Sequence, residues 1–449
     1  MSGYREYFKG KKITLMGLGL LGRGIGDAEF LAECGAIVTV TDKKTEAELA
    51  ESVERLKKYP NITFHLGGHR EEDFVTTDLV IKAAGVPLDS PEIAAARKAG
   101  VQVAMSTALF AKFAIDAGAK VVGVTGTRGK STITQMIAHT LIRANKQIVL
   151  GGNVRGVSTL AMLPKLSKDY PWTTIVVLEL DSWQLQGFWD LKISPNIAVF
   201  TNLMPDHQNY YASMEQYFED KANIFRYQHA GDTLIVGESV KEQAEAARPP
   251  VAPQVPLAIP ADWRLRVIGE HNRENASFAA AALRALGLSG EEIRSGLESF
   301  QPVEGRLQFV REVRGVKIYN DNNATTPEAT IAALRALGEN IILITGGSEK
   351  GLELKELVME IKKRTSKVIL LTHSNYMGSQ RLAGELEREG VPFEGVQNLR
   401  EAVEKGVNGR KGEKGKEEVL LFSPAFASFG MFKNEYDRND QFMRLINEL

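Results

Sequence analysis

The chain has 449 residues, of which 43% are hydrophobic and 25% are charged, and its formal net charge is −1. This length predicts about three domains, and the near-neutral charge gives no electrostatic reason to expect nucleic acid or an anionic membrane as a partner. No apolar run reaches transmembrane length and the N-terminus MSGYREYFKGKK has no signal core, so we expect a cytoplasmic protein. Cys34 is the single cysteine, which excludes an intrachain disulfide and a cysteine-rich metal site.

Strands and helices alternate in the first part of the chain, up to about residue 112. The expected elements are strands Lys12–Met16, Ile37–Thr41, Ile62–His65 and Leu79–Ala83 and a helix over Gly24–Cys34. The glycines of Gly17-Leu-Gly19-Leu-Leu-Gly22 follow the first strand, and Asp42 ends the second. This pattern is typical of a dinucleotide-binding turn whose acid holds a ribose. An NAD-dependent oxidoreductase is therefore one hypothesis, and glycines that only let helix and strand pack closely are another.

The second part of the chain opens with the most informative motif, Val121-Val-Gly-Val-Thr-Gly-Thr-Arg-Gly-Lys-Ser-Thr132. A strand, a glycine-rich turn and a helical pattern follow one another there, as in a phosphate-binding loop. Gly126 and Gly129 allow backbone N–H groups to approach an anion closely. Lys130 supplies a charge for terminal phosphates, and Ser131 supplies a hydroxyl for Mg²⁺. The alternative is a glycine-rich turn that binds nothing.

Polar residues end two further strands of the second part, Thr174–Leu180 and Ile197–Asn202. Ligands gather at the carboxyl ends of parallel strands, so Glu179 is expected beside the phosphate loop as an oxygen ligand for Mg²⁺. His207 follows the other strand beside an aspartate, and we favour a ligand over a packed histidine. Lys221, judged on sequence physics alone, is a solvated helix lysine.

The HNREN stretch opens an alanine-rich helix, expected over Glu274–Leu286. Asn272 is placed to cap this helix. Asn275 lies one turn further on, where its amide can also reach a purine or a phosphate. The helix ends at Gly287, a residue that commonly terminates helices.

The third part of the chain starts near residue 304 and again alternates strands with helices. Its expected strands are Val316–Tyr319, Ile341–Thr345, Lys367–Thr372 and Val419–Phe422. The pair Thr326-Pro327 has the chemistry of a helix cap and first turn, which leaves Asp321 and Thr325 for a ligand. Lys350 lies on a glycine loop at a strand end and is an anion-site candidate, and Ser428 ends the similar loop SPAFAS.

The valine- and isoleucine-rich strands predict parallel sheets covered by helices in all three parts. We therefore expect an α/β protein of three domains. They are a Rossmann-like domain over residues 1–112, a P-loop ATPase-like central domain over 113–303, and a Rossmann-like domain over 304–449.

The order of the motifs along nearly the whole chain resembles the Mur ligase family of peptidoglycan synthesis. The motifs are T-G-T-x-G-K-S-T, E-L-x-S-x-Q-L, D-H, the helix lysine, H-N-x-x-N, N-D-x-x-A-T and S-P-A-x-A-S-x-x-x-F-K-N. Within the family the chain is most similar to the branch that adds D-glutamate. The resemblance implies an ATP-dependent, ADP-forming amide ligase with two Mg²⁺ ions that activates a carboxylate as an acyl phosphate.

The resemblance also assigns roles to individual positions. The UDP of a UDP-muramoyl substrate, rather than NAD, would lie against Gly19, Leu20 and Asp42, with Asn153 facing the muramoyl group. The residues that would contact ATP are Gly126, Thr127, Gly129, Lys130, Ser131, Thr132, Asn275, Arg306 and Asp321. The catalytic and metal-binding set would be Lys130, Ser131, Glu179, His207 and Lys221, the last matching the lysine that the family carbamylates. The incoming D-glutamate would be held by Thr325, Lys350 and Ser428.

Four positions depart from the family pattern, and one of them is Arg128, which stands in the phosphate loop where the family usually has asparagine. Asn323 replaces a lysine, Gly305 replaces a histidine before Arg306, and Glu435 replaces an aromatic residue that the D-glutamate branch often has. Three alternatives therefore stay open: a related ligase for another amino acid or carboxylate, the oxidoreductase, and a P-loop protein that binds without catalysis. In each case we expect small-molecule partners, no nucleic acid or membrane, and a monomer.

Overall fold

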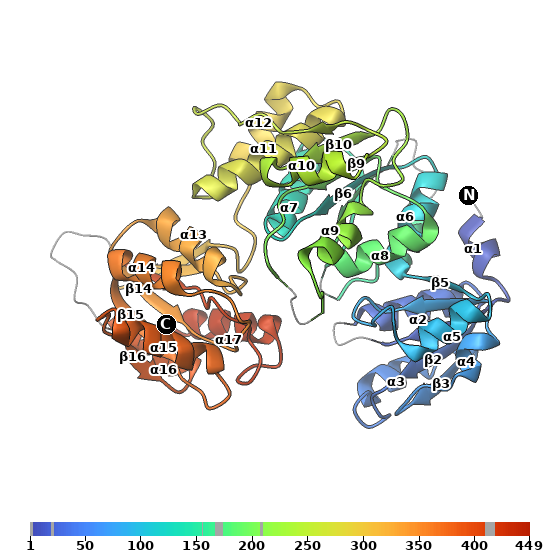
Figure 1. The fold of residues 1–449 in the computed structure, drawn as a ribbon, viewed down its shortest axis with the longest axis horizontal. Coiled ribbons are helices and arrows are strands. Elements are labelled where there is room, and N and C mark those ends of the chain that lie inside the picture. The colour runs from blue at the N-terminus through green and yellow to red at the C-terminus, as the bar shows by residue number, and fades with distance from the viewer. Residues whose placement is uncertain (1–2, 19–21, 155, 167–173, 207–209, 409–417) are drawn as a thin grey trace. The chain divides into compact units, whose positions relative to one another are not determined.

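The computed structural model describes residues 3–18, 22–154, 156–166, 174–206, 210–408 and 418–449. The chain forms two compact units, one of Met1–Ala258 with Ala276–Leu297 and the other of Ile259–Asn275 with Glu298–Leu449. The first unit holds two sheets and the second unit holds one, each drawn between its helices in Figure 1. None of the described helices is both long and apolar enough to cross a membrane.

The first sheet is parallel and has the strand order β3-β2-β1-β4-β5. Its strands are β1 (Lys12–Met16), β2 (Ile37–Asp42), β3 (Ile62–Leu66), β4 (Leu79–Lys82) and β5 (Gln102–Ala104). The helices of this part are α1 (Gly3–Phe8), α2 (Arg23–Glu33), α3 (Ala50–Leu56), α4 (Glu72–Val75) and α5 (Pro91–Lys98). The predicted strands and helix are confirmed to within two residues, and β5 is an addition. Cys34 is buried at the end of α2.

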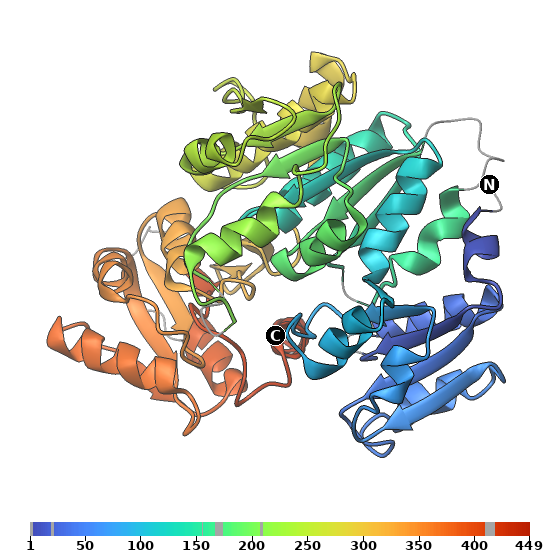
Figure 2. The same cartoon turned by 45° about the vertical axis from the view of Figure 1, so that its right-hand side comes forward.

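The second sheet, whose strands run from cyan to green in Figure 2, is also parallel. Its strand order is β11-β10-β9-β6-β8-β7. Its strands are β6 (Lys120–Thr125), β7 (Ile148–Gly152), β8 (Ile175–Glu179), β9 (Ile197–Phe200), β10 (Thr233–Val236) and β11 (Pro253–Gln254). The helices are α6 (Ser106–Asp116), α7 (Lys130–Arg143), η1 (Leu160–Leu166, 3₁₀), α8 (Ser182–Leu191), α9 (Met214–Ala222), α10 (Glu238–Ala246), α11 (Glu270–Ala285) and α12 (Gly290–Ser299). Because β8 and β9 flank β6, their carboxyl ends lie on either side of the loop that follows β6.

The third sheet has the order β12-β13-β17-β14-β15-β16. Its strands are β12 (Gln308–Val313), β13 (Val316–Asn320), β14 (Ile341–Thr345), β15 (Thr365–Leu371), β16 (Glu394–Val396) and β17 (Glu418–Phe422). Its helices are α13 (Pro327–Leu337), α14 (Lys355–Arg364), α15 (Met377–Arg388), α16 (Leu399–Asn408) and α17 (Glu435–Asn447).

Two sequence predictions about local structure are wrong. The third sheet is not wholly parallel, because β12 pairs antiparallel with β13 through a tight turn at Arg314 and Gly315, both with positive φ. Asn272 does not cap its helix, because α11 already begins at Glu270; the Asn272 amide instead donates to the Ile268 carbonyl at 2.8 Å. Thr326 occupies the predicted N-cap position of α13 and Pro327 lies in the first turn, but the Thr326 side chain makes no capping hydrogen bond to the helix.

A buried polar contact joins α2 to the segment before η1 within the first unit. The Ser158 hydroxyl donates to the Asp27 carboxyl at 2.6 Å, and both side chains are buried. Burial raises the pKa of Asp27 from 3.8 to about 6, outweighing the hydrogen bond from Ser158. A carboxyl buried in this way stabilises the fold when protonated and destabilises it when ionised.

Asp27→Asn should flatten the pH dependence of stability. The contribution of Asp27 is fully present below its unfolded pKa near 4 and is lost as pH rises through about 6. Ionising Asp27 at pH 8 should therefore cost roughly 3 kcal/mol, which the amide avoids. Urea unfolding at pH 4.5 and pH 8 measures this, with exposed Asp116→Asn as the control. Equal pH dependence in Asp27→Asn and the wild type would contradict the assignment.

Candidate active site

The loop between β6 and α7 has the backbone of a phosphate-binding turn. Gly126 has φ +141°, and a Cβ there would lie 1.9 Å from the Thr201 hydroxyl oxygen, so only glycine fits. Gly129 is the N-cap of α7 at φ 86°, and no side chain caps the helix. The helix N-terminus therefore presents its dipole and its first N–H groups at the loop, which favours an anion.

Residues that follow β9 hold this loop in shape. The Asn202 carbonyl and side-chain oxygens accept from the backbone N–H groups of Thr127 and Arg128, at 3.0 and 2.8 Å. The Thr201 hydroxyl donates to the Arg128 carbonyl at 2.7 Å, and the Met204 N–H donates to the Thr127 hydroxyl at 2.9 Å. The turn is thus fixed before any ligand arrives, which lowers the cost of binding.

Two lysine side chains meet at one carbonyl oxygen of the loop. Lys130 Nζ donates to the Gly126 carbonyl at 2.9 Å and to the Thr127 carbonyl at 3.2 Å. Lys221 Nζ donates to the same Gly126 carbonyl at 3.0 Å. The two amines repel each other when both are charged. An anion bound at the loop, or loss of the charge on one lysine, would relieve this repulsion.

Lys221 is the amine whose charge is disfavoured. It is 1% exposed, at the C-terminal end of α9, and its Nζ lies 4.6 Å from the centre of the Tyr217 ring. Burial, with the nearby Lys130 charge, holds the pKa of Lys221 well below its ordinary value. The sequence interpretation of Lys221 as a solvated lysine is therefore wrong: α9 turns it toward the phosphate loop.

Glu179 ends β8 and pairs in register with Val124 of β6, two residues before Gly126. Its carboxylate is 7% exposed and accepts from the Asn153 amide at 3.3 Å. Arg23, from the start of α2, donates to the other end of the Asn153 amide at 2.8 Å. His207 lies outside the described residues. Among the described residues no three acidic, histidine or cysteine side chains form a metal cluster.

Asp42 holds the glycine turn of the first sheet. Its carboxylate accepts from the backbone N–H groups of Leu18 and Lys44, both at 3.0 Å. Gly19 and Leu20, the other two candidates at this turn, lie outside the described residues. The structure therefore gives Asp42 a role in shaping the turn.

The second unit gathers another set of predicted residues at the carboxyl ends of β13, β14 and β17. Asp321 accepts from the Leu307 N–H at 3.0 Å and from the Ser423 hydroxyl at 2.9 Å, and burial raises its pKa to about 7. Lys350 Nζ lies 3.4 Å from the Thr325 hydroxyl. Arg306 donates to the Asn323 carbonyl at 3.4 Å, and Ser428 is buried. Asn275 lies apart from these strand ends, in α11, and its amide donates to the Asn272 side chain at 3.1 Å.

Comparisons with known proteins identify the family. A MurD-like N-terminal domain model of the Mur ligases matches residues 11–105, the Mur ligase middle domain matches 124–252, and the Mur ligase glutamate ligase domain matches 305–426. A UDP-N-acetylmuramoylalanine–D-glutamate ligase of Roseiflexus sp. (strain RS-1) is 35% identical over 97% of this chain and 98% of its own length. The chain belongs to the Mur ligase family. A relative of the same name from Acetivibrio thermocellus is 31% identical over 100% of this Mur ligase and 99% of its own length.

Solved structures share the fold of this Mur ligase. UDP-N-acetylmuramate–alanine ligase MurC of Thermotoga maritima aligns with a TM-score of 0.60 and 20% identity over 98% of this chain and 99% of its own. MurF of Acinetobacter baumannii aligns with a TM-score of 0.57 and 15% identity over 99% and 92%. The predicted α/β fold of three domains is confirmed.

Two of the four departures of this Mur ligase from the family pattern, Asn323 and Gly305, lie in contact. The Asn323 N–H donates to the Gly305 carbonyl at 3.0 Å, and a Cβ on Gly305 would lie 2.9 Å from the Asn323 amide nitrogen. A side chain at position 305 would therefore displace Asn323. Glu435, the third departure, is half-buried in the first turn of α17, and its carbonyl accepts from the Asn322 amide at 2.9 Å.

Arg438 organises this region of the Mur ligase, and the sequence analysis missed it. Its guanidinium is fully buried and donates to the Asn322 side chain and carbonyl, both at 2.8 Å, and to the Phe426 carbonyl at 3.2 Å. It thereby joins the loop after β13 to the loop after β17. The spacing of the apolar residues could have indicated its burial, because Arg438 lies four residues before Phe442 and eight before Ile446, on the same buried face of the helix.

Arg438→Met should destabilise the second unit and leave the first unit intact. Methionine fills the volume of arginine but leaves the Asn322 and Phe426 oxygens without their donor in a buried place, for a loss of about 2–4 kcal/mol. The matched control is Arg444→Met, which changes an exposed arginine on the same helix. Urea unfolding measures both, and equal midpoints for the two variants would refute this role of Arg438.

Proposed function

We propose that this Mur ligase joins D-glutamate to UDP-N-acetylmuramoyl-L-alanine, converting ATP to ADP and phosphate in peptidoglycan precursor synthesis. The observation that carries the proposal is the meeting of Lys130 and Lys221 at the Gly126 carbonyl, with Glu179 on the neighbouring strand. The relatives described above, named for D-glutamate ligation, support the choice of amino acid.

ATP is the first substrate, and the phosphate loop is its anchor. The triphosphate would lie against the N–H groups of Gly126 through Thr132, with Lys130 at the terminal phosphate. The resemblance to the family also assigns Asn275, Arg306 and Asp321 to ATP.

The donor set beside the loop fits Mg²⁺. Magnesium prefers hard oxygen ligands and is usually held by one or two carboxylates together with substrate phosphates. The buried carboxylate of Glu179 and the hydroxyl of Ser131 are such ligands, and His207 and a carbamylated Lys221 would complete the two sites. Bound Mg²⁺ would neutralise negative charge that develops on the transferred phosphoryl group.

The burial of Lys221 supports its carbamylation. The lowered pKa of Lys221 favours the neutral form of its amine, which is the nucleophilic form. The nitrogen attacks the carbon of CO₂, an N–C bond forms, one proton is released, and the product is an anionic carbamate. This change removes the repulsion between Lys221 and Lys130 and adds an oxygen ligand near the loop.

The reaction has two steps. A carboxylate oxygen of the alanine attacks the γ-phosphorus of ATP, the bond from that phosphorus to the β–γ bridging oxygen breaks, and ADP leaves. The amine of D-glutamate then bonds to the acyl carbon, the acyl C–O bond breaks, phosphate leaves, and the nitrogen loses a proton. Lys130 stabilises charge on the phosphoryl group in the first step, and exclusion of water protects the acyl phosphate.

The remaining candidates bind the two other substrates. Gly19, Leu20 and Asp42 would hold the UDP group, and Asn153 would face the muramoyl group. Thr325, Lys350 and Ser428 would hold D-glutamate, with Lys350 as the partner of a carboxylate. In these assignments residues 1–112 hold the UDP group, residues 113–303 hold most of the ATP contacts together with Asn153, and residues 304–449 hold D-glutamate. The protein would act as a cytoplasmic monomer.

Release of phosphate from ATP tests the proposal. The purified chain is supplied with ATP, Mg²⁺ and UDP-N-acetylmuramoyl-L-alanine, and each of a panel of D- and L-amino acids is added in turn. Phosphate release that depends on D-glutamate alone is the expected result. Release with a different amino acid would move the specificity to another Mur-type ligase, and no release with any pairing would refute the function.

A further inference from the structure

Lys82 is a buried lysine that has no role in the reaction described above. It ends β4 of the first sheet, is 1% exposed, and donates to the Val86 carbonyl at 2.9 Å and to the Gln186 side-chain oxygen at 3.4 Å. None of its hydrogen-bond partners among the described residues is a carboxylate. Burial lowers the pKa of Lys82 to about 8. Burying an amine among neutral partners costs stability, so Lys82 is a candidate for a functional role.

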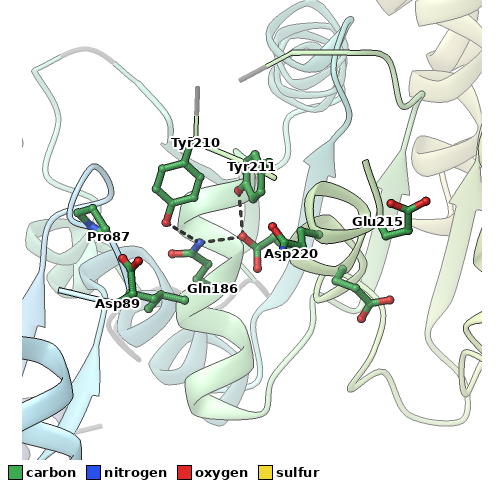
Figure 3. A pocket seen from close by; sticks show the side chains of 10 residues that line it. Pro87, Asp89, Gln186, Tyr210, Tyr211, Glu215 and Asp220 are labelled. Atoms are coloured by element: carbon green, nitrogen blue, oxygen red, sulfur yellow. Dashed lines mark hydrogen bonds between the residues drawn. The ribbon is translucent and has the colours of Figure 1, made fainter. Parts of the chain in front are cut away.

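Gln186 carries the contact from the first sheet into the helices of the second. Its side-chain oxygen accepts from Lys82, so its amide nitrogen faces the other way. That nitrogen donates to the Asp220 carboxylate at 2.7 Å and lies 3.2 Å from the Tyr210 hydroxyl oxygen, as Figure 3 shows. Tyr211 donates to the same Asp220 oxygen at 2.9 Å. The orientation of the Gln186 amide thus depends on the amine of Lys82.

This chain of contacts borders a cavity of about 680 Å³ within the first unit. Pro87 and Asp89 line it from the turn after β4, and Gln186, Tyr210 and Asp220 line it from the other side (Figure 3). Gln186 and Asp220 are therefore accessible from the cavity, whereas Lys82 itself is buried. On the side of α9 that faces the cavity, Asp220 is held by its bonds to Gln186 and Tyr211, whereas Phe218 and Ala222 pack the helix into the core.

Asp220 directly precedes Lys221 near the end of α9. Successive residues of a helix are about 100° apart around its axis, so bonds that fix Asp220 on one side of α9 also fix the direction in which Lys221 leaves the helix. Lys221 reaches the Gly126 carbonyl at 3.0 Å from that position. A small rotation of α9 would change this distance.

We propose that Lys82 is a positioning residue: through Gln186 and Asp220 it holds the end of α9 and so places Lys221 at the phosphate loop. The inference rests on the proposed function, because Lys221 has its role in that site. It also links the turn at Val86, in the domain assigned to the UDP substrate, with the ATP site of the next domain. Lys82 touches neither nucleotide nor metal in this account.

Lys82→Met tests the proposal by keeping the length of the side chain and removing its donor. We expect kcat to fall about 10-fold, because a displacement of about 1 Å at a reacting group is enough for such a loss. The KM for ATP should stay unchanged, and the concentration of bicarbonate that gives half-maximal activity should rise. Amide hydrogen exchange should quicken in α9 and not in α7. A merely structural role would not raise the bicarbonate requirement.

Gln186→Met interrupts the same chain at its middle and gives an answer even where Lys82→Met does not fold. A variant that combines Lys82→Met and Gln186→Met should be no less active than the less active of the two single variants, because both substitutions interrupt the same series of contacts. The matched control is Lys98→Met, an exposed lysine of the same domain. Wild-type kcat and exchange in both single variants, or multiplicative effects in the double variant, would overturn the proposal. If the wild-type protein ligates no amino acid, the proposed function is refuted. Amide hydrogen exchange in α9 of the two variants would then still test whether the contacts from Lys82 through Gln186 to Asp220 hold this helix.

Discussion

Lys130→Met should reduce kcat for ATP-dependent ligation by about 100- to 1,000-fold, the loss seen when one donor to a developing charge is removed. Lys130 Nζ lies within 3.2 Å of the Gly126 and Thr127 carbonyls, so it is part of the loop rather than of its surroundings. Methionine keeps most of the apolar part of the side chain and removes the amine, with its charge and its N–H donors. Initial-rate measurements of phosphate release with saturating substrates give kcat directly.

The matched control is Lys120→Met, which changes the exposed first residue of β6, the strand that precedes the phosphate loop. It should keep wild-type kcat and a wild-type unfolding midpoint. The interpretation of the loop as the ATP anchor would be wrong if Lys130→Met retained more than about a tenth of wild-type kcat, because an amine at the transferred phosphate is worth far more than tenfold.

Lys221→Met should separate stability from catalysis. An apolar side chain of similar volume avoids the cost of burying the Lys221 amine, so the unfolding midpoint should not fall. The kcat of the variant should fall at least about 100-fold, because methionine cannot form the carbamate that would offset the Lys130 charge and supply an oxygen ligand. Urea unfolding and phosphate release measure the two quantities on the same preparation.

Removal of CO₂ supplies the second half of this test. Wild-type activity should fall in CO₂-depleted buffer and return when bicarbonate is added, whereas Lys221→Met should respond to neither change. Activity of the wild type that is indifferent to CO₂ would contradict carbamylation, and Lys221→Met with normal kcat would contradict any role of Lys221 in the reaction.

The sequence predicted those features whose chemistry is local. Gly126, Gly129 and Lys130 are neighbours in the chain, and their spacing already defines the turn that the structure contains. Glu179 was placeable because a parallel sheet brings strand ends together. The strands that escaped prediction are short or lie at edges, such as β5 and β11, where a hydrophobic pattern has too few residues to be read.

Contacts between distant residues could not be predicted. Lys82 and Gln186 are 104 positions apart, and Arg23 and Asn153 are 130 apart. Nothing in either local sequence encodes the partner. The burial of Lys221 could not be predicted for the same reason, because its surroundings come from both the loop after β6 and α9. A lysine in a polar helix has no sequence feature that reveals burial, which depends on how the helix packs.

Transfer of oxygen from the carboxylate to phosphate tests the central claim most directly. UDP-N-acetylmuramoyl-L-alanine labelled with ¹⁸O in both carboxylate oxygens is incubated with the chain, ATP, Mg²⁺ and D-glutamate, and the released phosphate is examined by mass spectrometry. An acyl phosphate requires that each phosphate formed carries one ¹⁸O atom while the new amide keeps the other. Unlabelled phosphate would contradict activation of this carboxylate by ATP, and with it the function proposed for this Mur ligase.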